Sequence, residues 1–301
     1  MKLSHILPEM GFSDARIINE KDFTYLALSA SGIPQPHCIF LDSEKYIPDI
    51  AGTVTMVIAA PALENQLVSE QYGLCITENP RELFFSLHNF LSAREGYRRP
   101  AFATEIGEGA AVSPLASVAG QNVRIGRQAV IEEFAVIRPD TVIGDHAIIR
   151  AGAVIGGQGF EFKRTGGAIL SVEHAGGVII GDHAEIQYNS CIDRAVYPWD
   201  DTVIGGYSKL DNLVHVGHAV KIDRNVMIVA QSGIGGRTRI KPDCWIGFGA
   251  TVSNGLTVGE RSRVNIGAVA TRDVANDQSV TGNFAIEHTR FIQNLKKSAA
   301  D

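Results

Sequence analysis

VIGGYSKLDNLVHVGHAVKIDRNVMIVAQSGIGGRTRI, residues 203–240, carries an aliphatic residue at every sixth position, and this period decides the fold. The period extends from Ile180 to Ala270, where fourteen of sixteen such positions hold Ile, Val or Leu. An earlier block, from Ile125 to Ile155, keeps it without exception. An α-helix, with 3.6 residues per turn, cannot hold one face in register with a period of six. A six-residue repeat is typical of a parallel β-helix, so the sequence predicts a mainly β solenoid.

The period of six also predicts which residues stack on one another. Three six-residue strands make one triangular coil of about eighteen residues, with the aliphatic side chain inward on each strand. Successive coils are spaced like neighbouring strands, about 4.8 Å apart, so we expect a continuous aliphatic column inside. Residues about eighteen apart then lie one above the other. By this rule Gly236 lies above His218, and Asp200 lies below it.

The pattern divides the chain into three regions. Residues 1–100 lack the period and mix short apolar runs with a helical segment near Pro80–Leu91, which predicts a small N-terminal α/β domain. Residues 101–275 form the predicted β-helix. Residues 276–301 leave the repeat, and a short helix over Ile286–Lys297 is expected to cap the last coil, which otherwise exposes a sheet edge.

Two interruptions break the repeat. Residues 156–178, GGQGFEFKRTGGAILSVEHAGGV, are rich in glycine. We expect them to form a loop on one edge of the solenoid, where binding sites are commonly built. The second interruption, Ala195–Asp201, puts Pro198 at an inward position, which predicts a distorted coil.

Composition excludes several classes of protein. A formal net charge of −6 argues against a nucleic-acid binder, which usually carries a basic patch. No apolar run approaches the ~20 residues of a membrane span, and the N-terminus lacks the apolar core and cleavage site of a signal peptide. The four cysteines have no paired spacing and no CxxC. These features predict a cytoplasmic protein with reduced thiols.

A histidine cluster is the candidate for chemistry, since a solenoid by itself implies no activity. In His215-Val216-Gly217-His218 the valine faces inward, so His215 points outward and His218 lies at a corner. The stacking rule puts His218 under the glycine-rich turn of Gly236, within one coil spacing of a backbone N–H. A general base beside an oxyanion donor suits acyl transfer. The alternative is a solvent-exposed histidine on a turn.

Two other kinds of site fit the sequence poorly. A zinc site lacks a third Cys, His or carboxylate ligand at a convincing spacing. The glycines of residues 156–159 lack the strand–GxxxxGK[ST]–helix context of a phosphate-binding loop, so no ATP site is expected. The sequence therefore predicts neither a metal centre nor an ATP site.

KLDNLVHVGHAVKI, Lys209–Ile222, carries a resemblance to a known family. Together with Cys191-Ile-Asp-Arg and Asp201-Thr-Val-Ile-Gly, it resembles the UDP-3-O-(3-hydroxyacyl)glucosamine N-acyltransferases, lipid A enzymes that transfer an acyl group to a sugar amine. The resemblance covers nearly the whole chain. It implies a left-handed parallel β-helix and a homotrimer whose active sites lie between neighbouring subunits.

The resemblance also assigns roles to residues. His218 matches the general base that takes a proton from the attacking amine, and Asp211, seven residues earlier, matches the aspartate that orients it. Gly236 matches the backbone oxyanion donor. Asn212 belongs to the same motif as Asp211 and is assigned to substrate binding. The mechanism so implied is direct attack of the amine on a thioester, without a covalent acyl-enzyme.

The N-terminal region resembles the uridine-binding domain of the same family. Phe40-Leu-Asp-Ser43-Glu-Lys-Tyr46 keeps two aromatic residues at the family's spacing, with Ser43 where Asn is usual. The resemblance implies that Phe40 and Tyr46 stack on the uracil. Lys163 or Arg164 is expected to meet the diphosphate, and the alternative is that both are surface charges.

Three departures from the family leave the acyl donor open. Leu256 stands in an SNGL turn where the family has a second histidine, and the run after IDRA is two residues longer than usual. The chain also ends near the cap, without the longer C-terminal helices that the family uses around its acyl carrier protein. Residues 267–285 look like the last coil of short-chain acyl-CoA transferases of the same solenoid class.

The predicted function is N-acylation of a UDP-linked amino sugar, with an acyl carrier protein or coenzyme A thioester as co-substrate and no permanently bound cofactor. The first candidate is the lipid A reaction with a 3-hydroxyacyl group. The second keeps the chemistry but serves O-antigen or another surface polysaccharide, with a short acyl-CoA or acyl carrier protein as donor. The third, of another class, is a non-catalytic scaffold solenoid.

Overall fold

The computed structural model describes residues 1–12, 15–67, 70–282 and 285–298, and it divides into two compact units. The first unit comprises residues 1–102 together with the segments 158–177 and 194–201. The second comprises residues 103–157, 178–193 and the chain from Thr202 onward. Both interruptions of the repeat thus belong with the N-terminal region, whereas the sequence pattern assigned them to the β-helix.

The first unit is a small α/β fold. Its elements are α1 Leu3–Ile6, β1 Arg16–Ile18, β2 Tyr25–Leu26, β3 His37–Leu41, the 3₁₀ helices η1 Glu44–Asp49 and η2 Pro61–Gln66, β4 Val54–Ala59, β5 Gly73–Ile76, α2 Pro80–Ser92, β15 Phe162–Arg164 and β16 Ile169–Ser171. In the described part of this unit, a five-stranded sheet has the order β1-β5-β4-β3-β2, and only β1 is antiparallel to its neighbour. Helix α2 starts at Pro80, whose fixed φ suits a first helical turn.

A hydrophobic cluster packs on each face of this sheet. Successive side chains of a strand point to opposite faces. On β3, Cys38 therefore joins a cluster with residues of α1 and α2, whereas Ile39 joins a cluster with Leu63 of η2. The largest buried side chains include Phe84 of α2, which is 0% exposed. Full burial of such a side chain stabilises the fold by about 1.5–3 kcal/mol.

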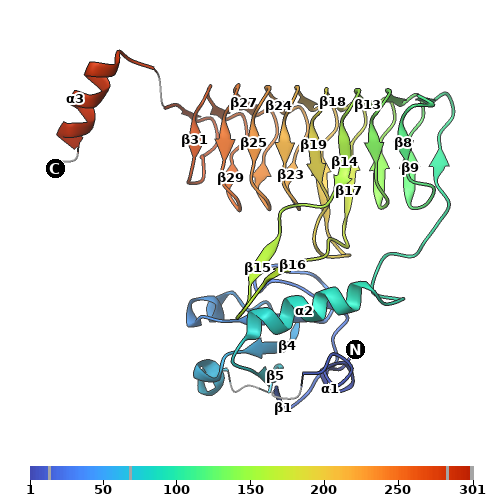
Figure 1. The fold of residues 1–301 in the computed structure, drawn as a ribbon, viewed down its shortest axis with the longest axis vertical. Helices are drawn as coiled ribbons and strands as arrows, with labels where there is room; N and C mark the ends of the chain where they lie inside the picture. The colour runs from blue at the N-terminus through green and yellow to red at the C-terminus, as the bar shows by residue number, and fades with distance from the viewer. Residues whose placement is uncertain (13–14, 68–69, 283–284, 299–301) are drawn as a thin grey trace. The chain divides into compact units, whose positions relative to one another are not determined.

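The segment 158–177 forms a hairpin of β15 and β16 that is part of the first unit (Figure 1). Helix α2 holds it by hydrogen bonds. The imidazole Nε2 of His88 lies 2.9 Å from the carbonyl oxygen of Glu173. The side-chain amide of Asn89 donates to the carbonyl of Ser171 at 2.7 Å and accepts from the N–H of Glu173 at 2.9 Å. These contacts explain why the hairpin belongs to this unit.

The segment 194–201 is held in the first unit in a similar way. The indole N–H of Trp199 donates to the carbonyl of Leu26 at 2.9 Å, and the ring of Tyr197 stacks on that of Trp199 with centroids 5.5 Å apart. Pro198 therefore lies outside the β-helix. Pro198 does not fill the predicted inward position, because the segment leaves the repeat and makes this coil irregular.

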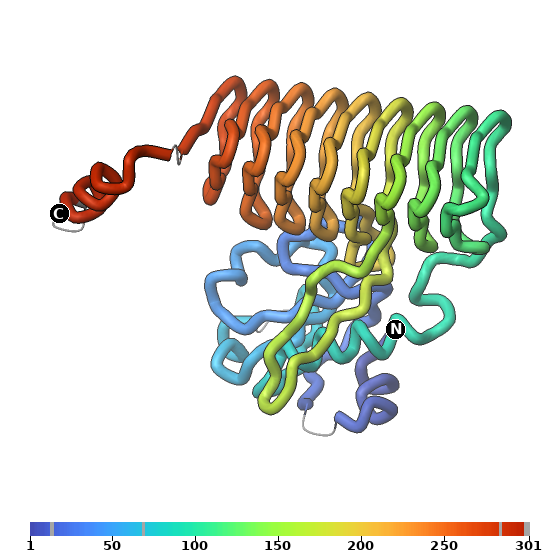
Figure 2. The backbone as a smooth tube through the Cα atoms, turned by 45° about the horizontal axis from the view of Figure 1, so that its top comes forward, coloured from blue at the N-terminus to red at the C-terminus, as the bar shows by residue number. Residues whose placement is uncertain are grey.

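The second unit is a parallel β-helix, as predicted. Figure 2 shows its coils stacked side by side along one axis. Within the described residues it has three parallel sheets, of nine, eight and eight strands. The first sheet comprises β7 Ala111–Val112, β10 Val130–Ile131, β13 Ile148–Ile149, β18 Glu185–Ile186, β21 Lys209–Leu210, β24 Met227–Ile228, β27 Trp245–Ile246, β30 Arg263–Val264 and β32 Ser279–Val280.

The other two sheets alternate with the first along the chain. The second sheet comprises β8 Ser117–Val118, β11 Val136–Ile137, β14 Val154–Gly157, β19 Cys191–Asp193, β22 His215–Val216, β25 Gly233–Ile234, β28 Thr251–Val252 and β31 Val269–Ala270. The third comprises β6 Glu105–Ile106, β9 Val123–Ile125, β12 Thr141–Ile143, β17 Gly177–Ile180, β20 Asp201–Ile204, β23 Lys221–Ile222, β26 Arg239–Ile240 and β29 Thr257–Val258. Each strand pairs with a strand about one coil away, which is the stacking that the period predicts.

The interior of the β-helix is an aliphatic column. Ile186, Val216 and Ile240, one from each sheet, are all 0% exposed. Buried hydroxyl groups satisfy their hydrogen bonds on neighbouring backbone: Ser208 Oγ donates to the carbonyl of Asp223 at 2.9 Å, and Ser232 Oγ to that of Gly247 at 2.8 Å. Ser208 and Ser232 therefore lie beside the column with their hydroxyl groups hydrogen-bonded.

The corners of the β-helix require an unusual backbone conformation. Many contain one residue with φ near +60°, and several of these are not glycine, among them Phe134 (60°), Tyr207 (63°) and Leu213 (58°). Such a conformation costs roughly 1–3 kcal/mol for a residue with a Cβ. The stacked hydrogen bonds of adjoining coils hold these corners, so the repeat imposes the conformation.

The C-terminal helix α3 spans His288–Ser298, close to its predicted position. Its apolar side chains are exposed in this chain: Phe291 is 51% and Leu295 is 54% exposed. Its role as a cap of the last coil stays a prediction. Among the described residues, no helix combines the length and apolar character that a membrane crossing requires.

Candidate active site

His218 lies at the corner of the β-helix between the second and third sheets, which we call the His218 corner. It follows β22, where Val216 pairs with Ile234 of the next coil, and its carbonyl accepts a hydrogen bond from the N–H of Arg237 at 2.9 Å. The segments 158–177 and 194–201 leave the β-helix at this same corner, after β14 and β19. Both departures from the repeat therefore start on the corner that carries the histidine.

Gly236 packs directly against the ring of His218, as the stacking rule predicts. A Cβ built on Gly236 would lie 2.7 Å from Nε2 of His218, closer than side chains tolerate, so only glycine leaves the ring in place. The residue His218 is 8% exposed. The backbone N–H of Gly236 donates to no acceptor in the part of the chain that the structure describes. A ring nitrogen and an available backbone donor thus lie next to each other on adjoining coils.

The coil below His218 differs from the prediction. Because Cys191 pairs with His215 and Ile192 with Val216, the coil that contains residues 194–201 is longer than eighteen residues. The simple count, which put Asp200 below His218, is therefore wrong. Asp200 belongs to the segment that leaves the repeat.

A buried carboxylate, Asp193, lies beside the histidine cluster. It ends β19 and is 8% exposed, and its Oδ2 lies 3.7 Å from Nε2 of His215. Burial raises the pKa of Asp193, while the charges of His215 and then His218 lower it. One carboxylate therefore interacts electrostatically with both imidazoles.

Asp211 and Asn212 lie at a different corner, between the first and second sheets. The carboxylate of Asp211 accepts hydrogen bonds from the N–H of Asn212 at 2.7 Å and from the N–H of Ala230 at 3.1 Å. The side-chain oxygen of Asn212 accepts from the N–H of Tyr188 at 3.2 Å. Both side chains thus hold the backbone of adjoining coils, and one side of the triangular coil separates them from His218.

The residues expected to bind uracil lie on opposite faces of the sheet in the first unit. Phe40 of β3 packs on Phe84 and Phe85, with ring centroids 4.9 and 5.7 Å apart. Tyr46 lies in η1, packs against the cluster on the other face and has Lys45 Nζ 4.7 Å from its ring centroid. Ser43 is the residue that precedes η1. The stacking of both rings on one base stays a prediction.

Lys163 and Arg164 are both on β15 but differ in their surroundings. Lys163 Nζ forms an ion pair with Glu161, which is 7% exposed, and lies 4.6 Å from the ring centroid of Phe85. Since Phe85 contacts Phe40, Lys163 lies close to the expected nucleotide-binding residues. Arg164 is exposed on the hairpin.

Arg81 is a candidate that the sequence did not single out. Its guanidinium lies 5.9 Å from the ring centroid of Phe40 and forms an ion pair with Asp42 at 2.6 Å. Arg81 lies in the first turn of α2 and belongs to no motif that the sequence shows. The sequence assigns no role to Asp193 of the Ile-Asp-Arg-Ala run, and it predicts of the neighbouring His215 only that it faces outward.

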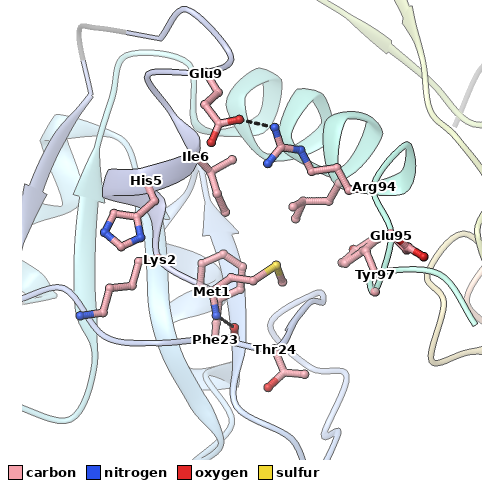
Figure 3. Close-up of a pocket in the computed structure, with 12 residues that line it drawn as sticks. Met1, Lys2, His5, Ile6, Glu9, Phe23, Thr24, Arg94, Glu95 and Tyr97 are labelled. Atoms are coloured by element: carbon pink, nitrogen blue, oxygen red, sulfur yellow. Dashed lines mark hydrogen bonds and ion pairs between the residues drawn. The ribbon is translucent and has the colours of Figure 1, made fainter.

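A surface pocket of about 450 Å³ also lies in the first unit (Figure 3). Its lining includes Lys2, His5, Glu9 and Arg94, of which Arg94 forms an ion pair with Glu9. None of the residues that line it is assigned to the site by the sequence. In the described part of the chain, no group of three or more His, Cys, Asp or Glu side chains is arranged to hold a metal ion.

Comparison with known proteins supports the sequence-based resemblance. The family model for bacterial transferase hexapeptide repeats (six repeats) matches residues 122–157. The UDP-3-O-acylglucosamine N-acyltransferase of Herminiimonas arsenicoxydans is 27% identical over 317 residues, which cover 95% of this chain and 88% of that protein. This chain is similar to the UDP-3-O-acylglucosamine N-acyltransferases. The predicted resemblance is confirmed.

Relatives with higher identity match shorter stretches of this chain. The UDP-3-O-acylglucosamine N-acyltransferase of Delftia acidovorans is 38% identical over 144 residues, 48% of this chain and 42% of that protein. The UDP-3-O-acylglucosamine N-acyltransferase 2 of Legionella pneumophila (strain Lens) is 50% identical over 99 residues, 33% of this chain and 28% of that protein. The chain thus spans less than half the length of these two relatives. All three relatives are acyltransferases by name, which bears out the prediction of an enzyme that transfers acyl groups.

Solved structures confirm the fold. The Arabidopsis UDP-N-acetylglucosamine acyltransferase matches with a TM-score of 0.55 at 24% identity, over 60% of this chain and 62% of that chain. The UDP-N-acetylglucosamine acyltransferase of Bacteroides fragilis matches with a TM-score of 0.51 at 22% identity, over 67% of this chain and 75% of that chain. The second unit is accordingly the predicted left-handed parallel β-helix.

Proposed function

We propose that the protein transfers an acyl group from a thioester to the amine of a UDP-linked amino sugar, at the His218 corner. The observation that carries this proposal is the packing of Gly236 against His218, whose Nε2 lies 2.7 Å from where a Cβ on Gly236 would be. A base next to an available backbone N–H is the arrangement that attack on a carbonyl requires.

The proposed reaction needs no covalent intermediate. His218 accepts a proton from the sugar amine as the amine nitrogen attacks the thioester carbonyl. The N–H of Gly236 donates to the oxyanion that develops on the carbonyl oxygen. As the tetrahedral intermediate collapses, the C–S bond breaks and the leaving thiolate takes the proton from His218. The products are an amide and a free thiol.

The nucleotide half of the substrate is proposed to bind the first unit. Phe40 supplies an aromatic surface, and Arg81 and Lys163 are cations close to it, with Lys163 4.6 Å from the ring that packs on Phe40. Tyr46 lies on η1 and Ser43 directly precedes it, and Arg164 offers an exposed charge on β15. Aromatic stacking and cationic groups are what a uridine diphosphate requires.

A homotrimer is part of the proposal. Asp211 and His218 lie at different corners of one coil, on either side of β22. For Asp211 to orient a His218, as the family resemblance implies, the two residues must come from neighbouring subunits. The exposed side chains Leu213 (53%) and Phe248 (45%) offer apolar surface for such packing. We place the reaction in the cytoplasm, with an acyl carrier protein or coenzyme A thioester as donor.

Leu256 favours a second candidate within the same chemistry. At the position where the family has a second histidine, this chain packs an apolar side chain against the core of the β-helix. Loss of that polar group favours a donor or sugar that differs from the lipid A substrates. The second candidate is therefore N-acylation of a UDP-linked amino sugar for a surface polysaccharide, with a short acyl thioester.

A thiol-release assay tests the proposal. UDP-amino sugars, with and without a 3-O-acyl group, are offered with short and long acyl thioesters of coenzyme A and of acyl carrier protein. We expect turnover with at least one pair, and a loss of about 10³-fold in His218→Ala. His146→Ala, an exposed histidine on another corner, serves as the matched control and keeps full activity.

The outcomes separate the candidates. Turnover that requires a long 3-hydroxyacyl carrier protein and a 3-O-acylated sugar supports the lipid A reaction. Turnover with a short acyl-CoA and an unacylated sugar supports the polysaccharide reaction. If the wild-type protein neither binds UDP nor turns over any pair, both acyltransferase reactions are contradicted. The non-catalytic scaffold solenoid is then the remaining candidate.

A further inference from the structure

The histidine cluster has a carboxylate neighbour in its own chain that the family resemblance does not use. Asp193 ends β19, and the strand register places Ile192 beside Val216, so the two residues that follow these are neighbours on adjoining coils. Its carboxylate lies 3.7 Å from His215 and interacts with the charge of His218. Asp211, in contrast, is hydrogen-bonded to the backbone of Asn212 and Ala230 at another corner.

We propose that Asp193 is the positioning residue of the histidine cluster, holding His215 and His218 in the orientation that proton transfer requires. The inference rests on the proposed function of His218 as the base. It adds a carboxylate from the same subunit as His218 to the Asp211 that the proposed trimer brings from a neighbouring subunit.

The burial of Asp193 makes the interaction effective. The residue is 8% exposed, and on the opposite side its strand neighbour is Gly157, where a Cβ would approach Oδ1 to 3.9 Å. The carboxylate of Asp193 therefore lies between two coils, at ordinary contact distance from the one below. A charge in such a place is screened less by solvent than a surface charge, so its effect on a nearby imidazole is larger.

Asp193 has titratable neighbours on two coils. Among the described residues, His215 and His218 on the coil above and Cys191 on its own strand interact with it electrostatically. Two imidazoles around one buried carboxylate form an arrangement in which the negative charge favours the protonated ring. The carboxylate therefore stabilises the imidazolium that His218 becomes after it takes the proton of the amine.

His215 fits the same role. Its side chain is 57% exposed, and its Nε2 is the atom that faces the carboxylate. When the ring of His215 is protonated, the carboxylate attracts this side of it, because the two charges are opposite. The Asp193–His215 pair thus forms one wall of the site, next to the base.

Asp193→Asn tests the inference, because it keeps the shape and removes the charge. We expect kcat to fall about a hundredfold with little change in KM. We also expect the acid limb of the pH–rate profile to move toward lower pH, because a negative charge beside the imidazoles is removed. Asp193→Glu restores the charge and is expected to recover part of kcat and the original acid limb.

Asp223→Asn is the matched control. Asp223 follows the inward Ile222 as Asp193 follows Ile192, but it is exposed on another corner beside Lys241, 3.8 Å away. We expect this variant to keep the wild-type rate and pH profile. If Asp193→Asn does not fold, as judged by circular dichroism, the smaller neutral variant Asp193→Ser replaces it.

Two results would overturn the inference. One is an Asp193 variant that loses thermal stability but keeps the wild-type acid limb and kcat, which indicates a purely structural residue. The other is an acid limb that moves in Asp211→Asn and not in Asp193→Asn. His218→Ala is measured in parallel, so that a failure of the proposed function is recognised separately. Full activity of His218→Ala would show that His218 is not the general base, and this conclusion does not depend on the Asp193 variants.

Discussion

The two units of the protein are stabilised in different ways. The β-helix has a core of aliphatic side chains that repeats from coil to coil, with hydroxyl groups paired to neighbouring backbone. The first unit instead depends on a few long-range contacts among aromatic and polar groups, such as Phe84 with Phe40 and His88 with Tyr97. The repeat therefore spreads its stability over many equal contributions, whereas the first unit concentrates it.

This difference teaches where the protein is vulnerable. Removing one side chain from the β-helix weakens one coil while its neighbours keep their own packing. Removing one aromatic side chain from the first unit affects the sheet, α2 and the segment 194–201 together, because Phe84 contacts Phe40, Phe85 and Tyr197. Four predictions follow from the contrast, in order of expected effect.

Phe84→Ala is expected to have the largest effect. Phe84 is 0% exposed, so its truncation leaves a cavity that costs about 3–5 kcal/mol. We expect the transition of the first unit in differential scanning calorimetry to move down while that of the β-helix stays in place. Phe160→Ala, at an 89% exposed position of the hairpin, is the control and should move neither. A single transition that moves as a whole contradicts the energetic separation of the units.

Mild acid is expected to act on the first unit alone. Burial is the largest cause that lowers the pKa of His88, to about 4 from an ordinary 6.5, and the carbonyl of Glu173 and then Arg98 modify it less. The unfolded chain therefore binds the proton more readily, and stability falls as the pH drops from about 6.5 toward 4, by about 3 kcal/mol in all.

Calorimetry between pH 7 and 4 measures this effect. The transition of the first unit should fall with pH, and in His88→Leu, which does not titrate there, it should fall less steeply. The exposed His288→Gln is the control and keeps the wild-type slope. An equal slope in wild type and His88→Leu contradicts the assignment to His88.

Gly236→Ala tests whether a change at the His218 corner affects the reaction without affecting the stability of the β-helix. The added Cβ meets Nε2 of His218 at 2.7 Å, so the ring must move. We expect kcat to fall about a hundredfold, equal to ~2.7 kcal/mol in the barrier, with little change in the melting temperature. Gly233→Ala, on β25 with nothing within 4 Å of its Cβ, should keep both rate and stability. A loss of folding in Gly236→Ala would show that the glycine is required for the structure of the coil and not only for the position of the His218 ring.

Ile228→Val is expected to have the smallest effect. Ile228 is 1% exposed in the column, and loss of one methylene costs about 0.5–1.5 kcal/mol. Urea unfolding of the β-helix should show a small decrease in midpoint at unchanged slope. Ile266→Val, at a 56% exposed position, is the control. A decrease of several kcal/mol would mean that the column is one cooperative unit.

The sequence predicted the β-helix well because this fold requires an aliphatic residue at every sixth position. Each inward position, such as Ile204 or Val216, repeats the same physical requirement, so many weak signals agree on one fold. The same stacking rule placed Gly236 beside His218, and the structure agrees. The first unit offers no period, so its elements were predicted only roughly and its sheet order was not predicted at all.

The failures have a physical cause as well. The segment 194–201 cannot be recognised from the period, because Ile192 and Ile204 keep the six-residue phase across it. A count of eighteen residues per coil therefore places Asp200 below His218, and the six-residue period places Pro198 in the interior of the β-helix. Both placements are wrong. Asp193 was missed because its role depends on the strand register between β19 and β22, which the count across the longer coil obscured. Arg81 was missed because its neighbour Phe40 is distant in the chain.

The departure of both non-repeating segments from one corner has a consequence for how such proteins diversify. Since the strands resume their pairing after each excursion, with Ile143 beside Ile180 and Ile192 beside Val216, an excursion imposes no new folding problem on the solenoid. Its sequence is then free to drift, lengthen or be exchanged by recombination. Natural selection, or a protein engineer, can replace the segments 158–177 and 194–201 while the coils that carry His218 and Gly236 stay unchanged.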